Sequence, residues 1–140
     1  MTLSAAKLKP GDQHTQVVAE DLTRTQIVQY AGASGDYNPL HTDEPFARDV
    51  AGYPGVFAHG MLTMALTGRA LTDWAGDGRL LEYGVRFTAQ VWPGDTLTTT
   101  ATVREITERD GVPVALIDVV TANQKGAPVV TGSVVVRLDP

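Results

Sequence analysis

The chain has 140 residues, which is enough for one domain with an apolar core and too few for two comfortable ones. Its formal net charge is -5 and its Lys and Arg residues are scattered, so we expect no nucleic-acid partner. The lack of cysteine excludes disulfides, thiolate metal sites and a cysteine nucleophile. Neither a signal-peptide core nor a run of roughly 18 apolar residues is found, and we therefore expect a cytoplasmic protein that does not enter a membrane.

The first elements are an edge strand and a helix. Residues 13–19, QHTQVVA, can pair as an edge strand. Thr23 and Gln26 then match a capping box, in which a hydroxyl and an amide side chain satisfy free backbone N–H groups at a helix start. Two glycines weaken this helix, which we expect to end near Ser34.

The stretch SGDYNPLH follows the first helix and carries two ionisable groups. It places Asp36 five residues before His41, with an Asn-Pro dipeptide between them. A residue before proline favours an extended or turn geometry. Asp43 followed by Pro45 is typical of the cap and first turn of a second short helix. We therefore expect Asp36 and His41 to lie on a rigid connection.

The rest of the chain predicts one long helix followed by strands. Residues 61–74 contain no proline, and their apolar side chains point in most directions around the helix, so we expect other structure to surround it. From about residue 81 the apolar period changes to two. The predicted strands are 82–92, 96–106, 112–122 and 128–138. Turns between them predict a four-strand antiparallel meander around the helix, an α+β architecture in a single domain of residues 1–140.

Asp36 and His41 are candidates for acid–base chemistry. Histidine titrates near neutral pH, and a partly desolvated carboxylate is a competent base, so the pair can take and give a proton. The residue types alone leave a simpler interpretation open. Asp36 can be a turn residue that bonds its own backbone, and His41 a surface side chain in the first turn of a helix.

Gly60 begins the long helix and follows His59. The first N–H groups of a helix have no partner inside it, and they can stabilise an oxyanion. A glycine there lets a ligand approach the backbone closely. The simpler interpretation is that Gly60 starts the helix and His59 is a capping or packed residue.

A metal site is the rival interpretation. His41 and Asp43 with His59 further on have the composition of the two-histidine, one-carboxylate triad of non-haem iron enzymes. That spacing is normally carried on strands of a β-barrel, whereas His41 lies in a helical stretch. We therefore expect no metal ligand set and no cofactor.

At these residues the sequence resembles the MaoC-like family, which includes (R)-specific enoyl-CoA hydratases and (3R)-hydroxyacyl-ACP dehydratases. The stretch YAGASGDYNPLHTDEPFA is similar to the hydratase motif of that family. FAHGMLTMALTGRALTDWAG and LEYGVRFTAQVWPGDTL resemble its central helix and next strand, in the same order. In detail the chain looks most like the beta-type subunits of actinobacterial fatty-acid dehydratases.

The resemblance implies a fold and roles for particular residues. The fold is the hot dog, a curved antiparallel sheet wrapped around one long helix, and two such subunits pair. Asp36 and His41 match the catalytic residues, and the backbone N–H of Gly60 matches the oxyanion donor. Asn38 is implied to shape the catalytic loop, while His59 has a structural, site-shaping role. Gly68 stands about where some members carry a hydroxyl that supports the aspartate.

The implied reaction is reversible addition of water to a trans-2-enoyl thioester, giving an (R)-3-hydroxyacyl thioester of CoA or acyl carrier protein. Asp36 activates the water and His41 exchanges the proton at C2. An acyl thioesterase of the same fold is one alternative. A homodimer is the expected assembly, and a heterodimer with a second hot-dog subunit is the other. A non-catalytic subunit would have lost Asp36 or His41, and both are present.

Overall fold

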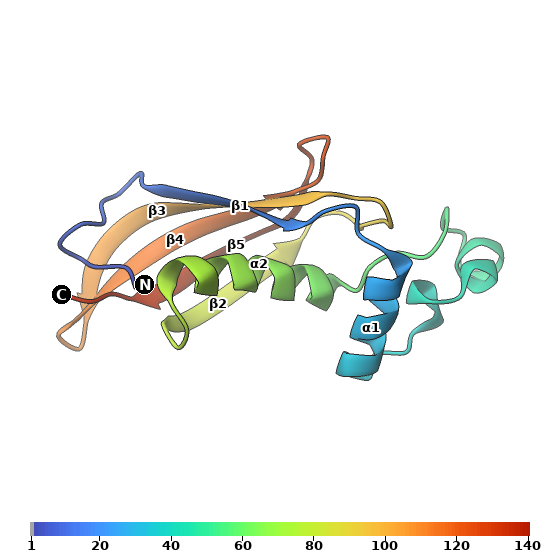
Figure 1. Ribbon diagram of the computed structural model, residues 1–140, viewed down its shortest axis with the longest axis horizontal. Coiled ribbons are helices and arrows are strands. Elements are labelled where there is room, and N and C mark those ends of the chain that lie inside the picture. The colour runs from blue at the N-terminus through green and yellow to red at the C-terminus, as the bar shows by residue number, and fades with distance from the viewer. Residues whose placement is uncertain (1) are drawn as a thin grey trace.

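The computed structural model describes residues 2–140 as a curved five-stranded sheet that covers one long helix, α2 (Gly60–Ala75) (Figure 1). All four strand pairings are antiparallel, and the order across the sheet is β1-β3-β4-β5-β2. The strands are β1 (Gln13–Ala19), β2 (Leu80–Phe87), β3 (Leu97–Arg109), β4 (Val112–Ala122) and β5 (Pro128–Arg137). This is the predicted hot-dog fold of the α+β class, with β1 at one edge as expected.

The predicted four-strand meander is wrong in one strand. β3, β4 and β5 do follow one another as hairpins, but β2 pairs with β5 across the sheet rather than with β3. The strand predicted over residues 82–92 also ends early, at Phe87. Alternation of apolar residues identifies a strand but carries no information on its partner. The nine-residue connection between β2 and β3, residues 88–96, is too long for a tight hairpin turn.

Register shifts accompany the curvature of the sheet. The pairing shifts between Val103 and Glu105 where β3 meets β4, and between Leu80 and Glu82 where β2 meets β5. Such irregularities bend a strand and increase its twist. The sheet therefore closes around α2 along one side of the helix.

α1 (Arg24–Ser34) has the predicted start and stop signals. Thr23 Oγ1 accepts a hydrogen bond from Gln26 N at 3.0 Å, and Gln26 Oε1 accepts one from Thr23 N at 2.9 Å, so the capping box is confirmed. Gly35 ends the helix in the left-handed region, with φ of 75°. Glycine tolerates that conformation best, and it turns the chain directly into Asp36.

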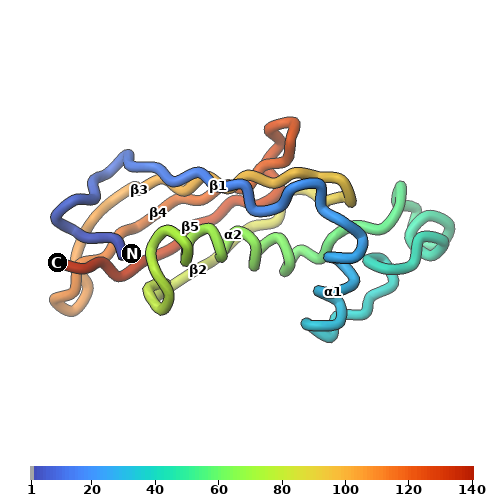
Figure 2. Tube along the Cα trace, viewed as in Figure 1, coloured from blue at the N-terminus to red at the C-terminus, as the bar shows by residue number. Residues whose placement is uncertain are grey.

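The connection from α1 to α2 projects beyond the N-terminal end of α2 (Figure 2). It holds a short 3-10 helix, η1 (Pro39–His41), and a π-helical turn, η2 (Phe46–Val50). The predicted cap is present, because Phe46 N donates to Asp43 Oδ1 at 3.1 Å. The short helix after it is mostly π rather than α, a difference that sequence signals do not encode.

α2 faces the sheet on one side and solvent on the other. Its buried residues are Thr63, Thr67, Ala70, Leu71 and Ala75. The sheet wraps the helix as expected, and Met61, which is 56% exposed, lies on the side that the sheet leaves open in the single chain. Among residues 2–140, no helix combines the length and the apolar character needed to cross a bilayer.

Two apolar clusters fill the space between helix and sheet. One surrounds Leu71 near the C-terminal end of α2. The other joins Ile27 of α1 to Ala58, Val91 and Val129 near the N-terminal end. The second cluster fixes α1 and the α1–α2 connection against the sheet, and it thereby holds the loop that carries Asp36.

Candidate active site

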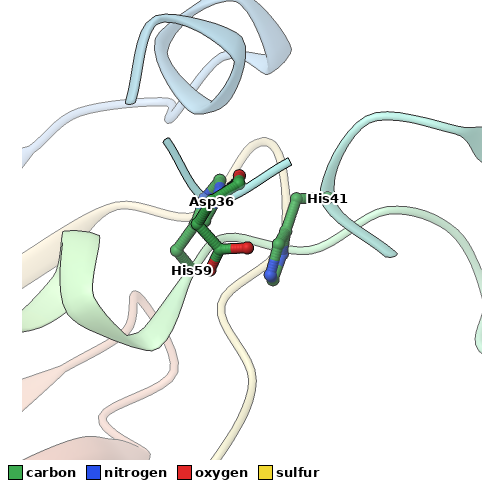
Figure 3. A group of neighbouring side chains, drawn as sticks. All are labelled: Asp36, His41 and His59. Carbon is green, nitrogen blue, oxygen red and sulfur yellow. Dashed lines mark hydrogen bonds between the residues drawn. The ribbon is translucent and has the colours of Figure 1, made fainter. Parts of the chain in front are cut away.

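Asp36 lies in an exposed loop directly after α1. Its Oδ1 accepts a hydrogen bond from Asn38 N at 3.2 Å, and its own N–H donates to Ser34 Oγ at 3.1 Å. The hydrogen bond from Asn38 N is the one expected if Asp36 were only a turn residue that bonds its own backbone. It leaves the other carboxylate oxygen free, and Figure 3 shows the carboxylate directed toward His41.

His41 is not the surface residue of the simpler interpretation, since only 9% of it is exposed. Its Nδ1 lies 2.6 Å from the carbonyl oxygen of Phe57, a distance that requires a proton on Nδ1. The neutral ring therefore presents an unprotonated Nε2. The ring of Phe57 also packs edge-on against it, with centroids 5.2 Å apart.

His59 lies just before the first residue of α2 and is 1% exposed. Its ring stacks on that of His41, with centroids 3.8 Å apart and planes inclined by 23°. Its Nε2 lies 3.0 Å from the carbonyl oxygen of Asp36. The structure thus brings together three residues singled out in the sequence, from the two ends of the connection between α1 and α2 (Figure 3).

Burial lowers the pKa of the His41 imidazole below its ordinary value. The hydrogen bond to the Phe57 carbonyl opposes this shift and raises the pKa. The nearby His59 lowers it further, and the Asp36 carboxylate raises it. Burial is the largest of these influences, so the neutral form of His41 is favoured.

Gly60 places its backbone N–H at the start of α2, beside a pocket. The pocket has a volume of ≈ 360 Å³ and lies between the first turn of α2 and residues 87–91. Its walls include Gly60 and Thr63 of the helix, Phe87, and the buried Val129. A Cβ at Gly60 would lie 3.3 Å from the Phe87 ring, so the glycine leaves room for that ring. Asp36 and His41 are not among the residues that line this pocket, although His41 contacts one of them, Phe57.

The metal triad weighed from the sequence is not assembled. The Asp43 carboxylate accepts a hydrogen bond from Phe46 N, at the first residue of η2, and Asp43 is not part of the cluster that contains His41 and His59. A different set, Asp36 with the two histidines, has ligand atoms within 4.8 Å of one another. However, imidazole lone pairs lie in the ring planes, and two nearly parallel stacked rings do not direct their nitrogens at one ion.

Asn38 lies where a loop-shaping residue is expected. Its side-chain Oδ1 accepts a hydrogen bond from Leu40 N at 3.0 Å, and its carbonyl oxygen accepts one from His41 N at 3.0 Å. These two contacts fix η1, which carries His41. Both ends of the Asp36–His41 connection are therefore tied to Asn38.

Gly68 lies away from Asp36 and faces Tyr83 instead. A Cβ at Gly68 would be 3.2 Å from the Tyr83 ring. The Tyr83 hydroxyl donates to the Met64 carbonyl oxygen at 2.7 Å, and burial raises the pKa of this phenol to about 12. Gly68 is therefore matched to an aromatic neighbour, and Asp36 is oriented by Asn38 and His59.

Sequence reasoning missed two participants. The carbonyl oxygen of Phe57 fixes the His41 tautomer, but a backbone group leaves no signature in the residue type. Phe87 lines the pocket beside Gly60, but in the sequence it is one apolar residue of an alternating strand. It is 48% exposed, and the alternation alone does not separate such a residue from a core residue.

Comparison with known proteins gives the family. The MaoC like domain matches residues 5–124, and the chain belongs to this family. It is 38% identical over 91 residues to 3-hydroxyacyl-thioester dehydratase Y of Mycobacterium tuberculosis, covering 63% of this chain and 31% of that protein. The chain thus spans about a third of that relative's length.

Two solved structures are similar over nearly the whole chain. The (R)-hydratase from A. caviae involved in PHA biosynthesis has a TM-score of 0.83 and 29% identity, and the match covers 96% of this chain and 99% of that one. R-Hydratase PhaJ1 from Pseudomonas aeruginosa has a TM-score of 0.85 and 26% identity, covering 99% and 88% respectively.

Proposed function

We propose that the protein is a hydro-lyase that reversibly adds water to trans-2-enoyl thioesters and forms (R)-3-hydroxyacyl thioesters. The observation that carries this proposal is a carboxylate and an imidazole, within 4.8 Å of each other, at the N-terminal end of a helix. The (R)-hydratase structures and the dehydratase relative support the reaction class.

The mechanism assigns one proton transfer to each side chain. In dehydration, the bare Nε2 of His41 takes the proton from C2, and a protonated Asp36 gives a proton to the departing hydroxyl at C3. In hydration the steps reverse: Asp36 takes a proton from the water that attacks C3, and His41 returns a proton to C2. One water is added or lost, and no oxidant or metal is needed.

Gly60 stabilises the negative charge that develops on the substrate. Charge that leaves C2 moves onto the thioester oxygen, and the free N–H of Gly60 donates to that oxygen. The dipole of α2 favours negative charge at the same point. Because the neighbouring pocket is lined by Gly60 but not by the catalytic pair, it accommodates part of the thioester next to the carbonyl. Asn38 and His59 shape the site around the pair.

Product analysis tests the reaction class. Purified protein is incubated with crotonyl-CoA, and loss of the conjugated absorbance is followed together with free thiol. We expect (R)-3-hydroxybutyryl-CoA without thiol release. Free CoA formed at the same rate as the absorbance is lost would instead identify a thioesterase.

A metal-independent reaction is part of the proposal. Chelation followed by gel filtration should leave the hydration rate unchanged, because the stacked imidazoles do not converge on an ion. One bound iron or zinc per chain, with activity lost when it is removed, would support a metal enzyme in place of this mechanism.

The proposed partners are CoA or acyl carrier protein thioesters and a second hot-dog subunit. β2 is an edge strand, and Leu81 and Phe87 on it are 50% and 48% exposed. An exposed apolar edge strand is usually covered by another element or subunit, and a two-fold symmetric homodimer is the commonest such assembly. A heterodimer is the alternative, and light scattering of the protein expressed alone separates the two, since a subunit that needs a different partner would remain monomeric.

A further inference from the structure

His59 takes no part in the proton transfers, yet it is the most deeply buried ionisable side chain at the site. It is 1% exposed and lies between the backbone of Asp36 and the ring of His41. Tyr30 of α1 packs edge-on against its other side, with ring centroids 4.9 Å apart. A buried polar ring in such a position requires a physical explanation.

The hydrogen bonding of His59 fixes its tautomer. Its Nε2 faces a carbonyl oxygen, that of Asp36, at 3.0 Å and must therefore donate. Its Nδ1 is buried and has no hydrogen-bond partner within residues 2–140. A proton on Nδ1 would be a buried donor without an acceptor, which is costly. In the neutral ring of His59 the hydrogen is consequently on Nε2.

The same ring restrains His41. Stacking at 3.8 Å limits tilting of the His41 ring, while the Phe57 carbonyl limits its rotation by holding Nδ1. The two restraints together leave Nε2 as the free nitrogen of His41. Loss of the stack would leave one hydrogen bond to orient a ring that must meet C2 of the substrate.

We propose that His59 is a positioning residue that sets the relative placement of the catalytic pair, with one atom on the Asp36 backbone and one ring face on His41. This inference rests on the proposed hydration. It assigns to His59 an effect on turnover through two separable contacts, the Nε2–H donor and the ring stack. Correct placement matters because a misplacement of about 1 Å can cost ~10²-fold in rate.

Two substitutions separate the contacts. His59→Phe keeps a ring on His41 and removes the donor to Asp36, and His59→Gln keeps an amide donor and removes the ring. His14 provides the matched control, because it stacks on Trp74 with centroids 5.4 Å apart, away from the site. His14→Phe makes the same chemical change outside the active site.

We expect His59→Phe and His59→Gln each to lower kcat for crotonyl-CoA by about 10-fold with little change in KM, and His59→Leu by about 100-fold. His14→Phe should retain the wild-type kcat. In the Asp36→Asn background, His59→Phe should have no further effect, because the contact acts through Asp36. If His59→Phe acted only on folding, its effect on kcat would add to that of Asp36→Asn in the double variant.

Unchanged kcat in folded His59→Phe and His59→Gln proteins, or an additive double variant, would overturn the proposal. NMR of the His41 ring signals tests the positioning role of His59 independently of the proposed reaction. In His59→Gln we expect these signals to shift and broaden, and in His14→Phe to stay unchanged. If wild-type protein hydrates no enoyl thioester but the His41 signals respond in this way, the reaction is wrong and the positioning role stands. Unchanged His41 signals in His59→Gln would show that His59 does not position the His41 ring.

Discussion

The two ends of α2 differ in what they place against the rest of the molecule. At the N-terminal end, His59 and Gly60 meet a loop that carries two ionisable residues, and a pocket opens beside them. At the C-terminal end, Leu71 and Ala75 are each 1% exposed and pack among apolar strand residues. One continuous helix therefore has the proposed active site at one end and a packed apolar core at the other, and each end can be altered with the other as its control.

The largest effect should come from the catalytic pair. Asp36→Asn and His41→Gln are each expected to lower hydration of a short enoyl-CoA by ~10²- to 10⁴-fold, because each removes a positioned acid or base. The double variant should be little worse than the worse single one if the two residues act as a unit. Circular dichroism controls for folding. A folded Asp36→Asn protein with near wild-type rates would remove the catalytic assignment.

Leu71→Ala tests the other end of the helix. We expect it to lower the free energy of unfolding by about 2–5 kcal/mol, as for other large-to-small changes in a packed core. Urea unfolding measures this cost. At temperatures where the variant is folded, its kcat should match wild type, and a large loss of kcat in the folded variant would contradict the separation of the two ends.

A smaller effect should appear in the pH dependence of stability. Burial lowers the pKa of His41, so the unfolded chain gains its proton at a higher pH than the folded chain. The stability that neutral His41 contributes is complete above about pH 6.5, the ordinary histidine value, and declines as pH falls through that value toward the lowered pKa. Urea unfolding at pH 7.5 and 5.5 should show a larger decrease for wild type than for His41→Gln. Equal decreases would show that His41 does not carry this dependence.

The smallest effect is expected at Gly68, midway between the two ends. Alanine favours helix by about 1 kcal/mol over glycine, but its Cβ would lie 3.2 Å from the Tyr83 ring. In wild type we expect the two influences nearly to cancel. In a Tyr83→Leu background, Gly68→Ala should be stabilising, and thermal unfolding of the four proteins measures the coupling. Additive effects would mean that the ring yields without cost.

Local signals in the sequence identified most of the helices and strands. The capping box at Thr23, the long helix and the alternating strands depend on near neighbours, which is why they were predictable. The family resemblance identified Asp36, His41 and Gly60, and the structure brings Asp36 and His41 together. Their catalytic roles, and a single domain over residues 1–140, stay predictions.

What sequence reasoning missed depends on contacts between distant segments. The partner of β2 is a strand some fifty residues further on, and alternation within β2 cannot name it. Thr99, in a run of threonines on β3, is 1% exposed and shares a 2.7 Å hydrogen bond with Thr121, a burial that the residue type does not predict. The stacking of His59 on His41 likewise follows from how two loops meet.

The pairing of β2 with β5 determines when the site can be completed during synthesis. Residues 36–60 leave the ribosome well before Val129 on β5, which forms a pocket wall. At elongation rates of about 5–20 residues per second, the nascent chain spends several seconds with β2 unpaired. The loop that carries Asp36 and His41 is thus made before the strand that encloses the pocket, and a chain that stops before β5 would carry every proposed catalytic residue without a finished site.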